Sequence, residues 1–183
     1  MKIATKQAFV LPNPVGLVTV AEGESASNIV TIAWVGMACS DPVTVTIAVR
    51  PSRHSHELLL EEGEFVLNIP GEELLEAVDL CGKVSGGDSD KWELTGLTPE
   101  PAVGVRAPLI AECPYSLECR VIEMLELGAH DLFVARVLAA HADERILDER
   151  GRIDYQAFKP MAYLPYEYRG LGPKLDPAGT DRS

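Results

Sequence analysis

Long apolar segments are missing from this sequence of 183 residues. A membrane-spanning helix needs about 20 predominantly apolar residues, and the longest helix-like apolar run, Leu58–Leu60, has glutamates on both sides. The first eight residues contain two lysines, but no apolar core of signal-peptide length follows them. The sequence therefore predicts neither membrane insertion nor secretion, and we expect a cytoplasmic protein.

Basic residues are scarce: 16 lysines and arginines stand against 28 acidic residues, which gives a net charge of −12. A surface this acidic repels the phosphate backbone of nucleic acids and the headgroups of anionic lipids. Nucleic acid and membrane surfaces are therefore not expected as partners. An anionic small molecule can bind only where a local basic cluster overrides the overall charge.

Cysteine pairs with metal-site spacing are also absent. The four cysteines, Cys39, Cys81, Cys113 and Cys119, form no CxxC pair, which excludes the usual zinc-site spacing. In a cytoplasmic chain we expect all four to stay reduced and to act as small buried apolar residues. If one thiol is reactive, we expect it to be Cys81, because partial exposure near Lys83 favours the thiolate.

Sequence signatures of several enzyme classes are lacking too. The chain has no GxSxG nucleophile motif, no Walker loop and no GxGxxG motif, and the glycine-rich segment Gly82–Gly87 lacks the Walker spacing. His54 and His56 stand two positions apart at an expected helix start, so they face different sides of that helix. No metal site is therefore predicted.

The pattern of apolar residues predicts a single domain over residues 1–175 and a flexible C-terminal tail over 176–183. Segments with β-branched or alternating residues predict strands, which Gly36–Pro42 interrupts, and amphipathic segments predict short helices. The first helix has Ser52 as its N-cap and Gly63 at its end. The expected strands are Val15–Ala21, Ser27–Trp34, Val43–Val49, Phe65–Ile69, Tyr115–Val121 and His130–Ala140, and the expected helices are Arg53–Glu62, Glu72–Leu80 and Lys91–Leu94. This set is mainly β, α+β by count, and indicates a closed or partly closed barrel.

One segment, Arg50–His56 (RPSRHSH), is strongly basic and contains no acidic residue. It spans an expected strand end and helix start, where unpaired N–H groups and the helix dipole favour phosphate. Arginine side chains can hold phosphate oxygens through two parallel hydrogen bonds. From the residues alone, an exposed helix start with solvated arginines is an equally good interpretation.

Two further residues are candidates for contact with a ligand. Trp34 ends an expected strand, where a tryptophan can stack on a planar ligand, although packing in the core is the better single-residue interpretation. His130 follows a turn at Gly128-Ala129 and can donate a hydrogen bond to a ligand, although a lone histidine is more often structural.

Several short segments, taken in their order and spacing, carry a resemblance to a known family. They are Pro12–Val15, Asn28–Trp34, Val49–Ser55, Glu64–Pro70, Cys81–Gly86, Asp90–Lys91, Ala107–Pro114 and Leu127–Phe133. Across most of its length the chain resembles the flavin reductase-like, FMN-binding split-barrel family, and within it the flavoredoxin-type branch.

The resemblance implies an FMN-binding split β-barrel with Greek-key topology and short peripheral helices, which forms a homodimer with FMN near the subunit interface. It implies that the flavin ring lies along Asn28, Thr31, Ile32, Ala33 and Trp34, and that the phosphate is held by Arg50, Ser52, Arg53, His54 and Ser55. A loop close to the flavin is matched by Cys81, Gly82, Lys83, Ser85 and Lys91. His130 matches a histidine often found near the site and is the candidate catalytic residue. The phosphate segment coincides with the basic segment, which favours the phosphate interpretation of Arg50–His56.

Three functions follow from the resemblance, and the sequence leaves them open. The first is an NAD(P)H-dependent flavin reductase or related oxidoreductase, in which FMN accepts hydride from NADH or NADPH and no acid or base residue is required. The second is an electron carrier with permanently bound FMN that serves a redox partner protein. The third is a ligand-binding barrel that has lost flavin.

Overall fold

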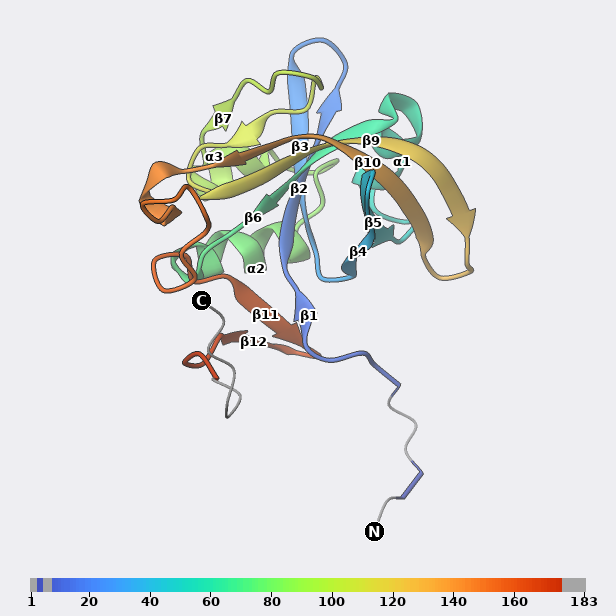
Figure 1. Ribbon diagram of the computed structural model, residues 1–183. Coiled ribbons are helices and arrows are strands. Elements are labelled where there is room, and N and C mark those ends of the chain that lie inside the picture. Colours follow the sequence, from blue (N-terminus) through green and yellow to red (C-terminus); the bar gives the residue numbers. More distant parts are fainter. Residues whose placement is uncertain (1–2, 5–7, 176–183) are drawn as a thin grey trace.

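Seven antiparallel strands form the main sheet of the computed structural model, in the order β3-β2-β6-β9-β10-β5-β4 (Figure 1). The structure describes residues 3–4 and 8–175, so the tail predicted for residues 176–183 lies outside it. The strands of this sheet are β2 (Gly16–Glu22), β3 (Ala26–Ile32), β4 (Val35–Ser40), β5 (Val43–Val49), β6 (Glu64–Ile69), β9 (Tyr115–Glu126) and β10 (Asp131–Ala142). Two short sheets join it, one of β1 (Asn13–Pro14), β11 (Met161–Leu164) and β12 (Glu167–Gly170), the other of β7 (Pro99–Glu100) and β8 (Leu109–Ile110).

The helices are short and lie at the periphery. They are α1 (His54–Glu62), α2 (Leu75–Lys83) and α3 (Lys91–Thr95), with 3₁₀ turns η1 (Glu72–Leu74) and η2 (Glu144–Ile146). In Figure 1, β1 leads upward into β2, and the sheet of β1, β11 and β12 lies below the main sheet beside α2. Among the described residues, no helix is long and apolar enough to cross a membrane.

Buried apolar side chains form two clusters, one on each face of the β2-β3 hairpin. The larger cluster lies inside the main sheet, contains Phe65 and Phe133, and receives Leu59 from α1. The smaller cluster packs Ile29 against Val78 of α2. Because successive strand residues point to opposite faces, a hairpin with a core on both faces needs an unbroken apolar run, and residues 16–21 are all buried.

The prediction of a mainly β, antiparallel fold with short helices is confirmed, with local differences. Gly36–Pro42 was expected to interrupt the strands, but most of it belongs to β4, which pairs with β5 and absorbs an irregularity between Met37 and Cys39 as a bulge. The strand predicted to end at Trp34 ends at Ile32.

Both helices beside the basic segment also have different ends from those predicted. Helix α1 begins at His54, and its N-cap residue is Arg53 rather than Ser52, while Gly63 ends it in the left-handed conformation as predicted. Helix α2 continues to Lys83, past the Cys81-Gly82 pair expected to end it. An ion pair between Lys83 and Asp79 spans this last turn and supports the continuation.

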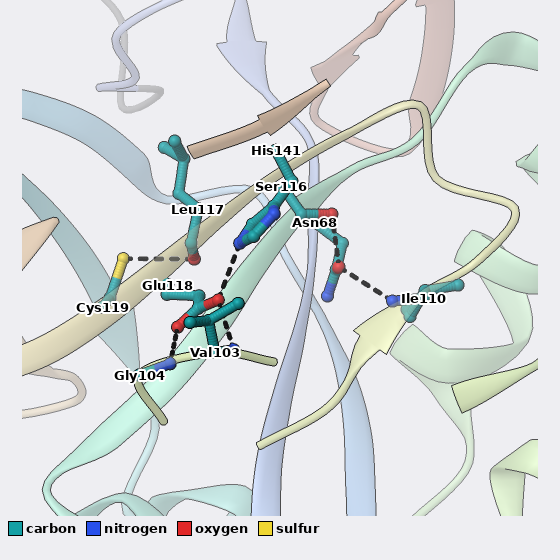
Figure 2. A network of polar contacts seen from close by, with 9 residues as sticks. All are labelled: Asn68, Val103, Gly104, Ile110, Ser116, Leu117, Glu118, Cys119 and His141. Carbon is teal, nitrogen blue, oxygen red and sulfur yellow. Dashed lines mark hydrogen bonds and ion pairs between the residues drawn. The ribbon is translucent and has the colours of Figure 1, made fainter. Parts of the chain in front are cut away.

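One acidic residue of β9, Glu118, is buried in the middle of the main sheet. Glu118 is fully buried, and its carboxylate accepts hydrogen bonds from the backbone N–H groups of Val103 and Gly104 at 2.8 and 2.6 Å (Figure 2). It also lies 2.7 Å from Nε2 of His141. Glu118 therefore fastens the loop before β8 to the centre of the sheet.

Candidate functional site

A wide cleft of about 640 Å³ opens where β3, β5, α2 and the β11-β12 turn meet. Much of its lining comes from the end of β3 and the following residues, from the end of β5 and from the last turn of α2. The predicted site residues that line this wide cleft are Thr31, Ile32, Ala33, Trp34, Arg50, Arg53, Gly82, Lys83 and His130. Residues remote in the sequence are thus gathered around one concave surface.

A small pocket of about 50 Å³ adjoins the wide cleft at the start of α1. Val30 and Arg53 line both cavities, so the two are neighbours. The predicted site residues around the small pocket are Asn28, Ser52, Arg53, His54, Ser55, Ser85 and Lys91. Its lining consists mainly of hydroxyl, amide and cationic groups, which are the donors that an anion requires.

The start of α1 is shaped by a tight turn in the basic segment. The backbone N–H of Arg53 donates to the carbonyl of Arg50 at 2.9 Å, and the N–H of His56 donates to the carbonyl of Arg53 at 2.9 Å. The pyrrolidine ring of Pro51 suits the beginning of such a turn. This turn directs the N-terminus of α1 at the small pocket, where its N–H groups and dipole favour a negative charge.

Lys91 contributes a buried cation to the small pocket. Its side chain is 4% exposed, and Nζ donates to the carbonyls of Ile29 at 2.6 Å and Cys81 at 3.1 Å. Burial lowers the pKa of Lys91, the nearby Cys81 thiol opposes this shift, and the positive charge of Arg53 adds to it. An ammonium group has three protons, so Lys91 keeps donor capacity beyond its two carbonyls.

The loop after α2 closes the small pocket against β3. Asn28 donates from Nδ2 to Oγ of Ser55 at 2.6 Å, which ties β3 to the first turn of α1. A Cβ atom at Gly86 would overlap the amide of Asn28, so the loop can approach β3 this closely only with glycine at that position. His54 completes this wall, with Nε2 3.0 Å from Oε1 of Glu22.

Arg50, His130 and Trp34 form a polar and aromatic group in the wide cleft. Nε of Arg50 donates to Nε2 of His130 at 3.3 Å, and the His130 ring lies 4.0 Å from the Trp34 ring, centre to centre. Since Nε2 accepts this bond, the ring proton of His130 sits on Nδ1. Trp34 is 45% exposed, so the prediction that it packs in the core is wrong.

Burial and charge keep this histidine neutral. Partial burial lowers the pKa of His130, the guanidinium of Arg50 lowers it further, and the carboxylate of Asp131 partly opposes both. At neutral pH, His130 therefore offers an Nδ1–H donor rather than a positive charge.

Comparison with known proteins places this geometry in a family. The flavin reductase-like domain matches residues 8–172 of the chain. The chain belongs to the flavin reductase-like family. This match spans both cavities and all the strands of the main sheet.

Individual members of the flavin reductase-like family agree with this assignment. An uncharacterized protein of Archaeoglobus fulgidus is 34% identical over 143 residues, covering 78% of this chain and 81% of that protein. The structure of the flavoredoxin of Desulfovibrio vulgaris (Miyazaki F) matches with a TM-score of 0.90 and 29% identity over 99% of both chains. The flavoredoxin of Methanosarcina acetivorans matches with a TM-score of 0.88 and 28% identity, over 99% of this chain and 97% of that one. The predicted split-barrel fold is thereby confirmed.

An aromatic wall of the wide cleft was missed in the sequence. Tyr163 and Tyr168 meet edge to face with ring centres 5.4 Å apart, and the backbone N–H of Tyr166 donates to Oη of Tyr163 at 3.2 Å. Tyr166 has a φ of 74°, which is uncommon for a residue other than glycine. Three tyrosines within six residues were the available signal, but nothing in the sequence places that segment beside β3.

Cys81 departs from its predicted role. Cys81 is 1% exposed, and among the described residues it is not part of the lining of either cavity. The Lys91 side chain donates to the carbonyl of Cys81, not to its thiol. Burial raises the pKa of the Cys81 thiol to about 11, which the charge of Lys91 only partly opposes. The predicted partial exposure of Cys81 is therefore wrong, and so is the prediction that all four cysteines are buried, because Cys39 is exposed.

We expect a thiol reagent to modify Cys39 first and to leave the other three cysteines unmodified in the folded protein. Burial raises the pKa of Cys119 to about 12 and that of Cys113 further still, so their thiolates are negligible at neutral pH. Mass spectrometry after brief labelling at pH 7.5 should show one label per chain, and the Cys39→Ser variant should show none. Early labelling of Cys81 would contradict this expectation.

Proposed function

We propose that this protein binds FMN and acts as an oxidoreductase that transfers hydride from NADH or NADPH to the bound flavin. The observation that carries the proposal is the pairing of a wide cleft with a small cationic pocket that share Val30 and Arg53. A flat ring system with a terminal phosphate needs both parts. The similarity in sequence and fold to two flavoredoxins supports a flavin as the ligand.

The residues present fit the phosphate of FMN. The small pocket combines the N-terminus of α1, the hydroxyls of Ser52 and Ser55, the guanidinium of Arg53 and the buried ammonium of Lys91. In a chain of net charge −12, this is the local cationic cluster that an anionic cofactor requires. We assign Ser52, Arg53, Ser55 and Lys91 to the phosphate, and the neighbouring Asn28, His54 and Ser85 to the walls that position them.

The residues of the wide cleft fit the flavin ring. β3 ends the order of strands in the main sheet, and the carbonyl of Ile29 points outward to Lys91 rather than to β2. In an antiparallel pair, residues two apart face the same way, so the N–H of Thr31 also points away from β2 and toward the cleft. Ala33, which follows the buried core residue Ile32, adds an apolar contact beside these backbone donors.

When bound, the flavin supplies the redox chemistry by accepting hydride from a reduced nicotinamide. The protein's own task is to hold the two reactants together, since positioning alone lowers such barriers substantially. We assign the backbone N–H groups of β3 and the side chain of Lys83 to stabilising negative charge on the ring. His130 accepts a hydrogen bond from Arg50 at Nε2 and keeps its N–H at Nδ1, so we assign it to orienting a reactant rather than to giving up a proton.

Hydride transfer should be nearly independent of pH between about 7 and 9, because His130 stays neutral throughout that range. The His130→Ala variant should lose less than about tenfold in rate, far less than loss of an essential acid would cost. Anaerobic mixing of the FMN-loaded protein with NADH or NADPH, followed at the flavin absorbance, measures both effects. A steep fall above pH 6.5 that disappears in the variant would show that His130 acts as an acid.

The electron-carrier function remains the second candidate, because the two solved structures named above are flavoredoxins. The same mixing experiment separates the two. Bleaching of bound FMN by NADH or NADPH supports the oxidoreductase, whereas bleaching only by a chemical reductant supports the carrier. Colourless purified protein that fails to take up FMN would leave a ligand-binding barrel without flavin.

We also propose a homodimer in which the second subunit covers the open side of the wide cleft. The rim of the cleft carries the exposed apolar side chains of Phe9, Trp34 and Tyr166, which are 48, 45 and 94% exposed. Apolar side chains gathered at one rim are typical of an interaction surface. Light scattering should therefore give twice the chain mass of 19.8 kDa at micromolar concentration. A mass of 19.8 kDa with FMN still bound would contradict the dimer.

A further inference from the structure

Next to the wide cleft, a buried histidine contacts a buried aspartate, and the proposed function assigns no part to either residue. Nε2 of His56 lies 2.7 Å from Oδ2 of Asp131, and the two residues are only 7% and 6% exposed. The His56 ring also meets the ring of Phe133 edge to face, with centres 5.5 Å apart. Burying a carboxylate is costly unless it is paired, so Asp131 depends on its contact with His56.

This pair joins three segments that build the site. His56 stands in the first turn of α1, whose N-terminus is directed at the small pocket. Asp131 is the first residue of β10 and directly follows His130. Across the sheet, Asp131 is paired with Val49, the last residue of β5, and Arg50 follows Val49. The start of α1, the end of β5 and the start of β10 therefore meet at one buried carboxylate.

We propose that His56 and Asp131 are positioning residues that hold the Arg50–His130 contact of the wide cleft in register with the small pocket. The inference rests on the proposed function, because it assigns the pair to the site that binds the flavin and its reductant. His56 fixes α1 to β10, and Asp131 fixes the backbone on which His130 stands. Without this contact, the start of α1 is no longer held against β10. The two cavities can then shift relative to each other although every lining residue is still present.

Charge gives the pair a second effect on the cleft. The charged groups that act on His130 are Arg50, which lowers its pKa, and Asp131, which raises it. Asp131 therefore affects both the backbone on which His130 stands and the pKa of His130.

The test compares three variants of the pair with a matched pair elsewhere on the same strand. His56→Leu removes the partner of Asp131, His56→Gln keeps an N–H donor near the same place, and Asp131→Asn keeps an acceptor but removes the charge. The control is His141→Leu, since Nε2 of His141 also lies 2.7 Å from a buried carboxylate, that of Glu118. His141 lines neither cavity as the described residues define them.

Two measurements report on the site without requiring activity. The first is the FMN dissociation constant, and the second is the pKa of His130 from NMR titration of its ring protons. We expect His56→Leu to weaken FMN binding by roughly tenfold, as is typical for residues that orient a binding group from behind. The pKa of His130 should move toward its ordinary value as the contact with Arg50 is lost. His56→Gln should restore both, and Asp131→Asn should lower the pKa of His130 with little change in FMN affinity.

His141→Leu should reduce stability but leave both measurements unchanged. Equal effects of His56→Leu and His141→Leu on FMN affinity and on the pKa of His130 would overturn the proposal, as would an unchanged site in both. If His56→Leu does not fold, the proposal is tested with His56→Gln and Asp131→Asn. An unchanged pKa of His130 in Asp131→Asn would then overturn the proposal. Failure of NADH and NADPH to reduce wild-type protein would refute the proposed function alone, because neither measurement depends on that reaction.

Discussion

Replacing Arg53 with alanine should raise the dissociation constant of FMN about 30-fold. Among the residues that the structure describes, Arg53 is the one cationic side chain that lines both the wide cleft and the small pocket, so it can contact the phosphate from the cleft side. A hydrogen bond to a charged group contributes about 2 kcal/mol, which corresponds to roughly that change in affinity. Quenching of flavin fluorescence during titration with protein measures the dissociation constant directly.

Arg50→Ala is the matched control for this prediction. Arg50 lies three residues earlier in the same basic segment, and its Nε donates a hydrogen bond to His130. In the part of the chain that the structure describes, Arg50 lines the wide cleft but not the small pocket. We expect a loss of less than about fivefold, because Arg50 does not line the small pocket assigned to the phosphate. Riboflavin lacks the phosphate, so its affinity should hardly differ between wild type and Arg53→Ala. Equal FMN losses in the two single variants would mean that both arginines hold the phosphate.

Glu118→Ala should destabilise the fold by about 3 to 5 kcal/mol, the usual cost of removing one partner from a buried charged network. The substitution removes the carboxylate that the N–H groups of Val103 and Gly104 and the Nε2 atom of His141 contact (Figure 2). For a chain of this size, the midpoint of thermal unfolding should fall by roughly 10 °C. Urea unfolding and calorimetry measure the change, and the exposed Glu123→Ala on the same strand should change stability by less than about 0.5 kcal/mol.

The Glu118 network also sets an acid limit to stability. Burial alone would raise the pKa of Glu118, but the N–H groups of Val103 and Gly104, together with His141, outweigh burial and hold the pKa below its usual range. Its stabilising contribution is therefore present above the unfolded pKa, near 4.3, and is lost as the pH falls through the lower folded pKa. Wild type should lose stability in that acidic range, whereas Glu118→Ala should lose less there, having nothing left to protonate.

The strands were predictable where one rule decided them. Val43–Val49 is β-branched at every position except Ala48, and the prediction matches β5 in full. β4 was missed because Gly36 and the following small and polar residues disfavour a strand locally, and only its pairing with β5 stabilises it. The burial of Glu118 could not be predicted, because the sequence of the strand does not reveal that a distant loop supplies two backbone donors.

The candidate site was predictable where its chemistry is concentrated in one segment. Arg50–His56 stands out in an acidic chain, and the structure brings this segment to the two cavities. Lys91 was tied to the site only through family resemblance, since its burial under two carbonyls depends on how α3 packs. The tyrosines of the β11-β12 turn and the His56–Asp131 pair were out of reach, because both depend on contacts between segments far apart in the chain.

Strand β3 lies at the edge of the main sheet, and this position matters for newly made protein that has not yet bound a ligand. An uncovered edge strand offers its backbone N–H and C=O groups to any other extended chain, which is a common route to aggregation. Lys91 and α3 cover the middle of β3 through the carbonyl of Ile29, but the stretch at Thr31 faces the wide cleft. A ligand lying there takes the place of a missing neighbouring strand. Newly made protein would then be most prone to aggregate before it binds flavin. The yield of soluble protein on expression should therefore rise with the supply of flavin.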